Sequence, residues 1–119
     1  MPCEACADGM TVEVDVTTIY ESDALVRCGA PLPDDAIKVT DPVIVVEVLS
    51  PSSRSRDVGA KLEDYFRLPS TCHYLIVKTE NRTVIHHASD AAGAIATRII
   101  KGDTITLDPP GIALRDIFS

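Results

Sequence analysis

The chain has 119 residues, a hydrophobic content of 45% and a formal net charge of −7 at pH 7. This length and composition predict one globular domain over residues 1–119, with residues 1–8 flexible. The acidic balance excludes tight, sequence-independent binding of nucleic acid through a broad basic surface. A nuclease stays compatible with it, because acidic metal ligands add negative charge that a bound cation offsets.

The sequence has no run of about 18 apolar residues, so it predicts no transmembrane helix. Its first residues lack a basic region followed by an apolar stretch, which is the pattern of a secretory signal. These observations predict a cytoplasmic protein with no membrane partner. In that compartment the cysteines are expected to be reduced; they are Cys3, Cys6, Cys28 and Cys72.

Cys3 and Cys6 form a single Cys-x-x-Cys pair. Such a pair fits half a zinc site or a redox site. Zinc needs four ligands, however, and no second closely spaced pair exists. A redox pair should open a helix, whereas Asp8-Gly9 predicts a turn. Incidental cysteines are therefore the preferred interpretation.

Two strands are predicted in the first third of the chain. Residues 11–16 alternate, with Val12, Val14 and Val16 on one face of a half-buried strand. Residues 24–28 form a second strand, with Asp23 at its start. The prolines and aspartates of residues 30–42 predict a loop.

Residues 43–49 are near-continuously apolar and rich in β-branched side chains, which predicts a central strand buried on both faces. Glu47 is the exception in this run. A buried carboxylate is costly unless it is paired or holds a cation, so Glu47 is the first candidate for a functional residue.

A helix is predicted over about residues 54–67, capped by Ser52 or Ser53 and stopped by Pro69. Apolar side chains at helical spacing are expected to face the core; they are Val58, Leu62, Tyr65 and Phe66. Asp57, Lys61 and Tyr65 share one face at spacings of four residues. Basic side chains around the helix form a candidate DNA-binding patch, namely Arg54, Arg56, Lys61 and Arg67.

The rest of the chain predicts strands. Residues 73–77 form a core strand and 83–87 its hairpin partner, 95–100 and 104–107 form another hairpin, and 112–118 form a short terminal helix or turn. His86 and His87 are adjacent and point to opposite faces, so they are interpreted as hairpin residues rather than metal ligands. The fold class is α/β (α+β), with a mixed central β-sheet and one main flanking helix.

Two acids at neighbouring strand ends, with a lysine on the next helix, outline a metal-dependent site that hydrolyses phosphodiesters. Asp23 and Glu47 can hold a magnesium ion, which prefers oxygen ligands and keeps several waters. Lys61 can stabilise the charge that grows on phosphorus. Glu47 and Lys61 also fit a purely structural ion pair, and the spacing alone leaves both interpretations open.

The residues 20–26 and 43–53, followed by Asp57, Lys61 and Tyr65, resemble the Uma-two family. This bacterial family belongs to the PD-(D/E)XK, restriction-endonuclease-like superfamily, and the resemblance covers roughly residues 9–118. It implies that Asp23 and Glu47 are metal-binding acids and that Lys61 is the catalytic lysine, moved onto the helix. The carbonyl of Val48 is expected in the metal shell. Asp57 and Tyr65 are candidate site-lining residues, and for Tyr65 a core role is the preferred interpretation.

The chain departs from the family in two respects: Ser22 precedes the acid where a proline is common, and the N-terminal part of the family fold is expected to be missing. A sheet shortened in this way exposes apolar surface, which predicts a homodimer. Two functions follow from the sequence. The first is an endonuclease that cleaves DNA with Mg²⁺ or Mn²⁺, and the second is a non-catalytic, truncated module that acts in protein interaction.

Overall fold

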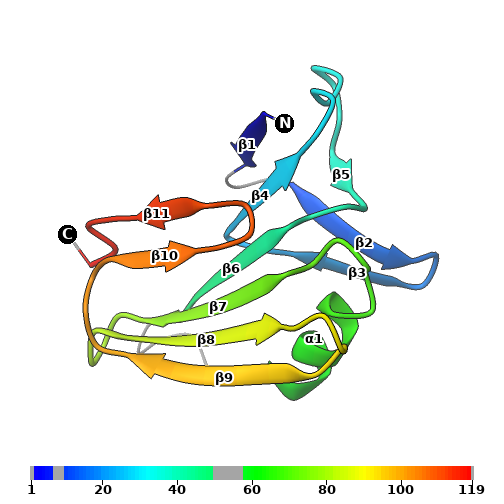
Figure 1. The fold of residues 1–119 in the computed structure, drawn as a ribbon. Helices are drawn as coiled ribbons and strands as arrows, with labels where there is room; N and C mark the ends of the chain where they lie inside the picture. The colour runs from blue at the N-terminus through cyan, green and yellow to red at the C-terminus, as the bar shows by residue number, and fades with distance from the viewer. Residues whose placement is uncertain (1, 7–9, 50–57, 119) are drawn as a thin grey trace.

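The structure is a computed structural model that describes residues 2–6, 10–49 and 58–118. Its largest element is a mixed, six-stranded sheet with the order β1-β4-β6-β7-β8-β9 (Figure 1). The bounds of these strands are Cys3–Cys6, Ala24–Cys28, Ile44–Leu49, His73–Lys78, Thr83–Ser89 and Ile95–Ile100. The pair β6 and β7 is parallel, and the other neighbours are antiparallel.

Strand β6 lies between β4 and β7, which confirms the central position predicted for the apolar run. A parallel neighbour requires a crossover connection, and this crossover contains the helix α1, Val58–Tyr65. The predicted helix was longer; residues 54–57 and the proposed caps lie outside the described residues. The mixed α+β class with one flanking helix is confirmed.

Two smaller sheets complete the fold (Figure 1). The first contains β3, β2 and β5, at Thr18–Glu21, Thr11–Asp15 and Lys38–Val39. The second is a hairpin of β10, Ile105–Leu107, and β11, Ile112–Leu114. Within the described residues no helix is both long and apolar enough to cross a membrane.

Each face of the large sheet has its own apolar core. On one face, Val45 and Tyr74 pack with Tyr65 of α1 and with Val12 of the three-stranded sheet. On the other face, residues of β6, β7 and β8 pack with the β10–β11 hairpin. The sheet is therefore buried on both sides along β6 and β7, as expected for strands that are apolar throughout.

Three local predictions were wrong. Strand β2 ends at Asp15, so Val16 lies in the turn to β3 and is 90% exposed. Strand β10 pairs with β11 rather than with β9, because the turn at residues 108–111 reverses the chain at once. For the same reason residues 112–114 form a strand, and of the predicted terminal helix or turn only a turn at residues 117–118 is present.

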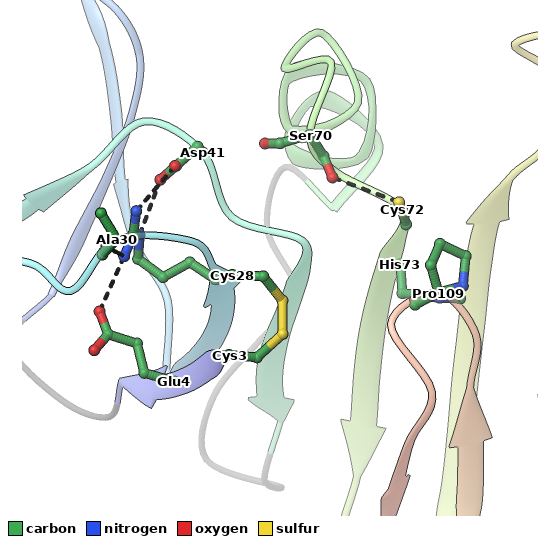
Figure 2. The surroundings of a disulfide bond; sticks show 10 residues. Cys3, Glu4, Cys28, Ala30, Asp41, Ser70, Cys72, His73 and Pro109 are labelled. Carbon is green, nitrogen blue, oxygen red and sulfur yellow. Dashed lines mark hydrogen bonds and ion pairs between the residues drawn. A yellow bond between two sulfur atoms is a disulfide. The ribbon is translucent and has the colours of Figure 1, made fainter. Parts of the chain in front are cut away.

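The expectation of four reduced cysteines differs from the structure. Cys3 and Cys28 form a disulfide (Figure 2), whereas Cys6 and Cys72 are free cysteines. Antiparallel pairing of β1 with β4 sets Cys3 directly opposite Cys28. Residues 1–8 were expected to be flexible, and this prediction is wrong for Cys3–Cys6, which form β1. The pairing of the two cysteines therefore had no local signal.

An ion-pair cluster lies beside the disulfide. The guanidinium of Arg27 donates to Glu4 on β1 and to Asp41, each at 3.1 Å. Figure 2 shows Glu4 and Asp41 on the same side of the disulfide. Arg27 is only 7% exposed, so its carboxylate partners offset the desolvation of its charge. Together with the disulfide, this cluster holds the edge strand β1 against β4.

Candidate active site

Glu47 lies near the carboxyl end of β6, on the face that α1 covers. Side-chain alternation puts it on the same face as the core residue Val45. Its Oε1 accepts hydrogen bonds from Nζ of Lys61 at 3.3 Å and from the hydroxyl of Tyr65 at 3.1 Å. Glu47 is 8% exposed, and these two donors offset the cost of burying its carboxylate.

Lys61 and Tyr65 lie one helical turn apart on α1, so both side chains reach the same strand. Tyr65 is fully buried, whereas the Lys61 side chain is 25% exposed. The ammonium of Lys61 lies 5.5 Å from the centre of the Tyr20 ring, where the face of the ring attracts a cation. Lys61 therefore connects a buried carboxylate with the solvent-facing rim of the site.

Asp23 directly precedes β4 and contacts β6 on both sides of Glu47. Its N–H donates to the carbonyl of Val46 at 3.1 Å, and its Oδ2 accepts from the N–H of Val48 at 2.7 Å. Alternation from Leu25, which packs in the same core as Val45, puts Asp23 on the face of Glu47. The structure thus brings the two predicted acids to one end of the sheet and onto one face.

Val48 contributes its backbone to this end of the sheet. In an extended strand the N–H and C=O of one residue point to the same side. Since the N–H of Val48 donates to Asp23, its carbonyl is directed to the same side of β6. The Val48 side chain is 41% exposed and belongs to the opposite face.

The other predicted residues either lie outside the described part of the chain or pair with carboxylates. Asp57, Arg54 and Arg56 lie outside the described residues. Arg67 pairs with Asp15 at 2.7 Å and with Asp64 at 3.2 Å. The part of the predicted basic patch that the structure describes is therefore matched by carboxylates.

Sequence reasoning gave no role to a second tyrosine beside the site. The hydroxyl of Tyr20 on β3 donates to Oδ2 of Asp64 on α1 at 2.6 Å. This contact ties the β2–β3 hairpin to the helix that carries Lys61. Helical spacing puts Lys61 and Asp64 on one face of α1, but it does not predict which residue Asp64 contacts. Tyr20 lies 44 residues away in the sequence, so this contact has no local sequence signal.

The donor set fits a hard divalent cation. Asp23, Glu47 and the Val48 carbonyl are all oxygen donors, the type that magnesium and manganese prefer. Among the described residues no group of three or more histidine, cysteine or acidic side chains can hold a metal ion. A cation bound by two carboxylates must complete its shell with water, carbonyl or phosphate oxygens, as magnesium commonly does.

Comparisons with known proteins give the family of the chain and a solved structure with a similar fold. The model of the Uma2 family, described as "Putative restriction endonuclease", matches residues 1–115. A comparison with curated proteins gave no match. A crystal structure of "a putative nuclease belonging to DUF820" from Anabaena variabilis ATCC 29413 superposes with a TM-score of 0.70. The two sequences are 13% identical, and the alignment covers 98% of this chain and 68% of the other.

A mixed sheet with two acids at neighbouring strand ends and a lysine from the following helix defines a restriction-endonuclease-like domain. The match over residues 1–115 then gives the family: the chain belongs to the Uma2 family. At 13% identity, the crystal structure establishes the shared fold alone.

Proposed function

We propose that this protein is an endonuclease that hydrolyses DNA phosphodiester bonds with Mg²⁺ or Mn²⁺. The observation that carries the proposal is the meeting of Asp23, Glu47 and Lys61 at one end of the large sheet. Both acids offer hard oxygen ligands, and Lys61 is the cation next to them. Family membership supports the same chemistry.

The residues divide the work as follows. Asp23, Glu47 and the Val48 carbonyl would hold the cation, which would supply a Lewis acid and lower the pKa of a bound water. Lys61 donates to a phosphate oxygen and stabilises the charge that grows there during attack. Because the Lys61 side chain is partly exposed, its ammonium can move from Glu47 to a phosphate oxygen.

DNA binding is expected to depend on the cation. The chain carries a net charge of −7, and Lys61 and Arg67 are already paired with carboxylates. A phosphate therefore gains little from the described basic side chains until a cation offsets the acids. We place this activity in the cytoplasm, where the DNA lies, although a disulfide such as Cys3–Cys28 is rare in a reducing compartment.

Titration with Mn²⁺, followed by calorimetry, tests the proposal. The wild-type chain is expected to bind the ion, and Glu47→Gln is expected to lose most of the binding heat, because it removes a ligand charge while keeping the side-chain shape. Glu63→Gln is the matched control, since Glu63 is an exposed acid on α1. Heat that is unchanged by Glu47→Gln contradicts the metal site and favours the non-catalytic module.

We also propose that two copies associate through β9. In the described part of the chain β9 is the last strand of the sheet, so one side of its backbone is open to pairing. Ile95 and Ile99 share a face and are 40% and 68% exposed. The face of β9 that carries Ile95 and Ile99 has no charged side chain, and an open edge of this kind is a template for pairing with a second copy.

Sedimentation velocity at micromolar concentration measures this association. Ile99→Lys is expected to give a monomer, because it places a charge on the open edge strand. Ile37→Lys is the control, since Ile37 is 67% exposed but lies in the loop before β5. A wild-type chain that sediments as a monomer at these concentrations rules out the β9 dimer.

A further inference from the structure

Both α1 donors to Glu47 use the same carboxylate oxygen. The ammonium of Lys61 lies 3.3 Å from Oε1 and the hydroxyl of Tyr65 lies 3.1 Å from it. Two donors on one oxygen fix the orientation of the carboxylate. The other oxygen, Oε2, is thereby presented as the one that a cation can take.

Of the two donors, Tyr65 is the rigid one. Its side chain is fully buried, and its ring lies 5.4 Å from that of Tyr20 and 5.0 Å from that of Tyr74. Lysine has four rotatable carbons and keeps part of its side chain in solvent, so it cannot hold Glu47 in one rotamer alone. A tyrosine wedged between two aromatic rings has no such freedom.

The Tyr65 hydroxyl is the donor in its bond to Glu47, because a carboxylate oxygen only accepts. This hydrogen bond holds Oε1 of Glu47 against a side chain that is fixed in the aromatic core.

Asp23 is held in a comparable way. Its Oδ2 accepts the N–H of Val48 at 2.7 Å, which fixes that carboxylate through the backbone. Each acid thus has one oxygen bound to a donor of the fold. Outer donors of this kind orient metal ligands and raise the affinity for the ion.

We infer that Tyr65 is a positioning residue, whose hydroxyl orients Glu47 toward a divalent cation shared with Asp23. The inference rests on the proposed metal site. It explains why a tyrosine is buried next to Glu47. Tyr65 does not touch the substrate in this arrangement. It acts through Glu47.

Calorimetric titration of Tyr65→Phe with Mn²⁺ tests the inference. The variant keeps the ring and its packing but removes the donor, so the Kd for the ion is expected to rise about 10- to 100-fold. Tyr74→Phe is the matched control. Tyr74 is also buried and packs on Tyr65, yet none of the hydrogen bonds found among the described residues joins it to Glu47. Its removal is expected to leave the Kd unchanged.

The outcomes separate this inference from the proposed function. If the wild-type chain binds no ion, the proposed metal site fails and the inference with it. If the wild type binds but Tyr65→Phe matches it, only the positioning role is overturned. Equal weakening by both variants, or a Tyr65→Phe chain that does not fold while Tyr74→Phe does, makes the hydroxyl a structural group and also overturns the role.

Discussion

Lys61→Ala is expected to lower the rate of metal-dependent plasmid nicking about 10²–10³-fold, the usual cost of removing one donor that stabilises a developing oxyanion. Lys61 forms an ion pair with Glu47 at 3.3 Å. Its side chain is partly exposed, so a phosphate at the rim can reach it. The nicking rate at saturating Mn²⁺ measures this contribution directly.

The loss must be separated from damage to the fold. Lys101→Ala is the control, because it removes the same charge from an exposed turn after β9. Melting curves show whether Lys61→Ala remains folded, as expected for a residue whose partner Glu47 retains the Tyr65 hydroxyl. Nicking by Lys61→Ala at the wild-type rate removes the catalytic role and leaves a structural ion pair.

The sequence predicted the centre of the fold because that part has a strong local pattern. The run 43–49 is apolar and β-branched, which determines a buried strand regardless of its neighbours. A charge within such a run needs a partner. Glu47 was therefore a candidate functional residue, and Lys61 on the following helix was its predicted partner. The contact between them is the ion pair that the spacing suggested.

The parts that could not be predicted depend on contacts between distant residues. Cys3 meets Cys28 only because β1 pairs with β4 in one register. The hydroxyl of Tyr65 is directed at Glu47 by the packing of three aromatic rings, whereas helical spacing predicts only that the residue is buried. Likewise, β10 has the same local pattern whether it pairs with β9 or with β11.

The histidines confirm one prediction and add a feature that the sequence did not suggest. His87 forms a hydrogen bond with Thr97 on the face of the large sheet that α1 covers. His86 belongs to a buried series of hydrogen bonds on the opposite face. The two side chains therefore point to opposite faces, as predicted. His73 Nε2 lies 2.7 Å from the carbonyl of Pro109, and its Nδ1 lies 2.8 Å from Nε2 of His86.

The groups at the two ends of this series of hydrogen bonds determine which atom donates in each bond. A carbonyl only accepts, so His73 Nε2 carries a proton and its Nδ1 accepts the Nε2–H of His86. At the other end the guanidinium of Arg98 only donates, and it lies 2.9 Å from Nδ1 of His86. Both histidines are therefore neutral, each with one ring nitrogen donating and the other accepting.

Protonation of His86 breaks this arrangement, because its Nδ1 would then carry a proton facing Arg98. Burial, with the nearby positive charge of Arg98, lowers the pKa of His86 to about 4. Burial also lowers the pKa of His73, although Asp108 and the Pro109 carbonyl oppose that shift. The pKa of His87 is lowered by burial as well.

The stability of the protein is expected to fall as the pH drops from about 6.5 toward 4. Between these pH values the histidine is protonated in the unfolded protein but not in the folded protein, so acid favours unfolding. The contribution to stability is fully present above the pKa of the unfolded state and is lost as the pH falls toward the pKa of the folded state. For His86 alone the loss between pH 7 and pH 5 is about 2 kcal/mol. Arg67 lowers the pKa of Asp15, so stability linked to that acid is lost only below the ordinary carboxyl range.

Urea unfolding at pH 7 and pH 5, followed by circular dichroism, measures this loss. His86→Gln is the diagnostic variant, because an amide can accept from Arg98 and donate to His73 without titrating. Its stability is expected to change much less between the two pH values than that of the wild type. His87→Gln, on the opposite face, should keep most of the wild-type dependence. Equal pH dependence in His86→Gln and the wild type would show that the buried chain does not carry the acid sensitivity of this fold.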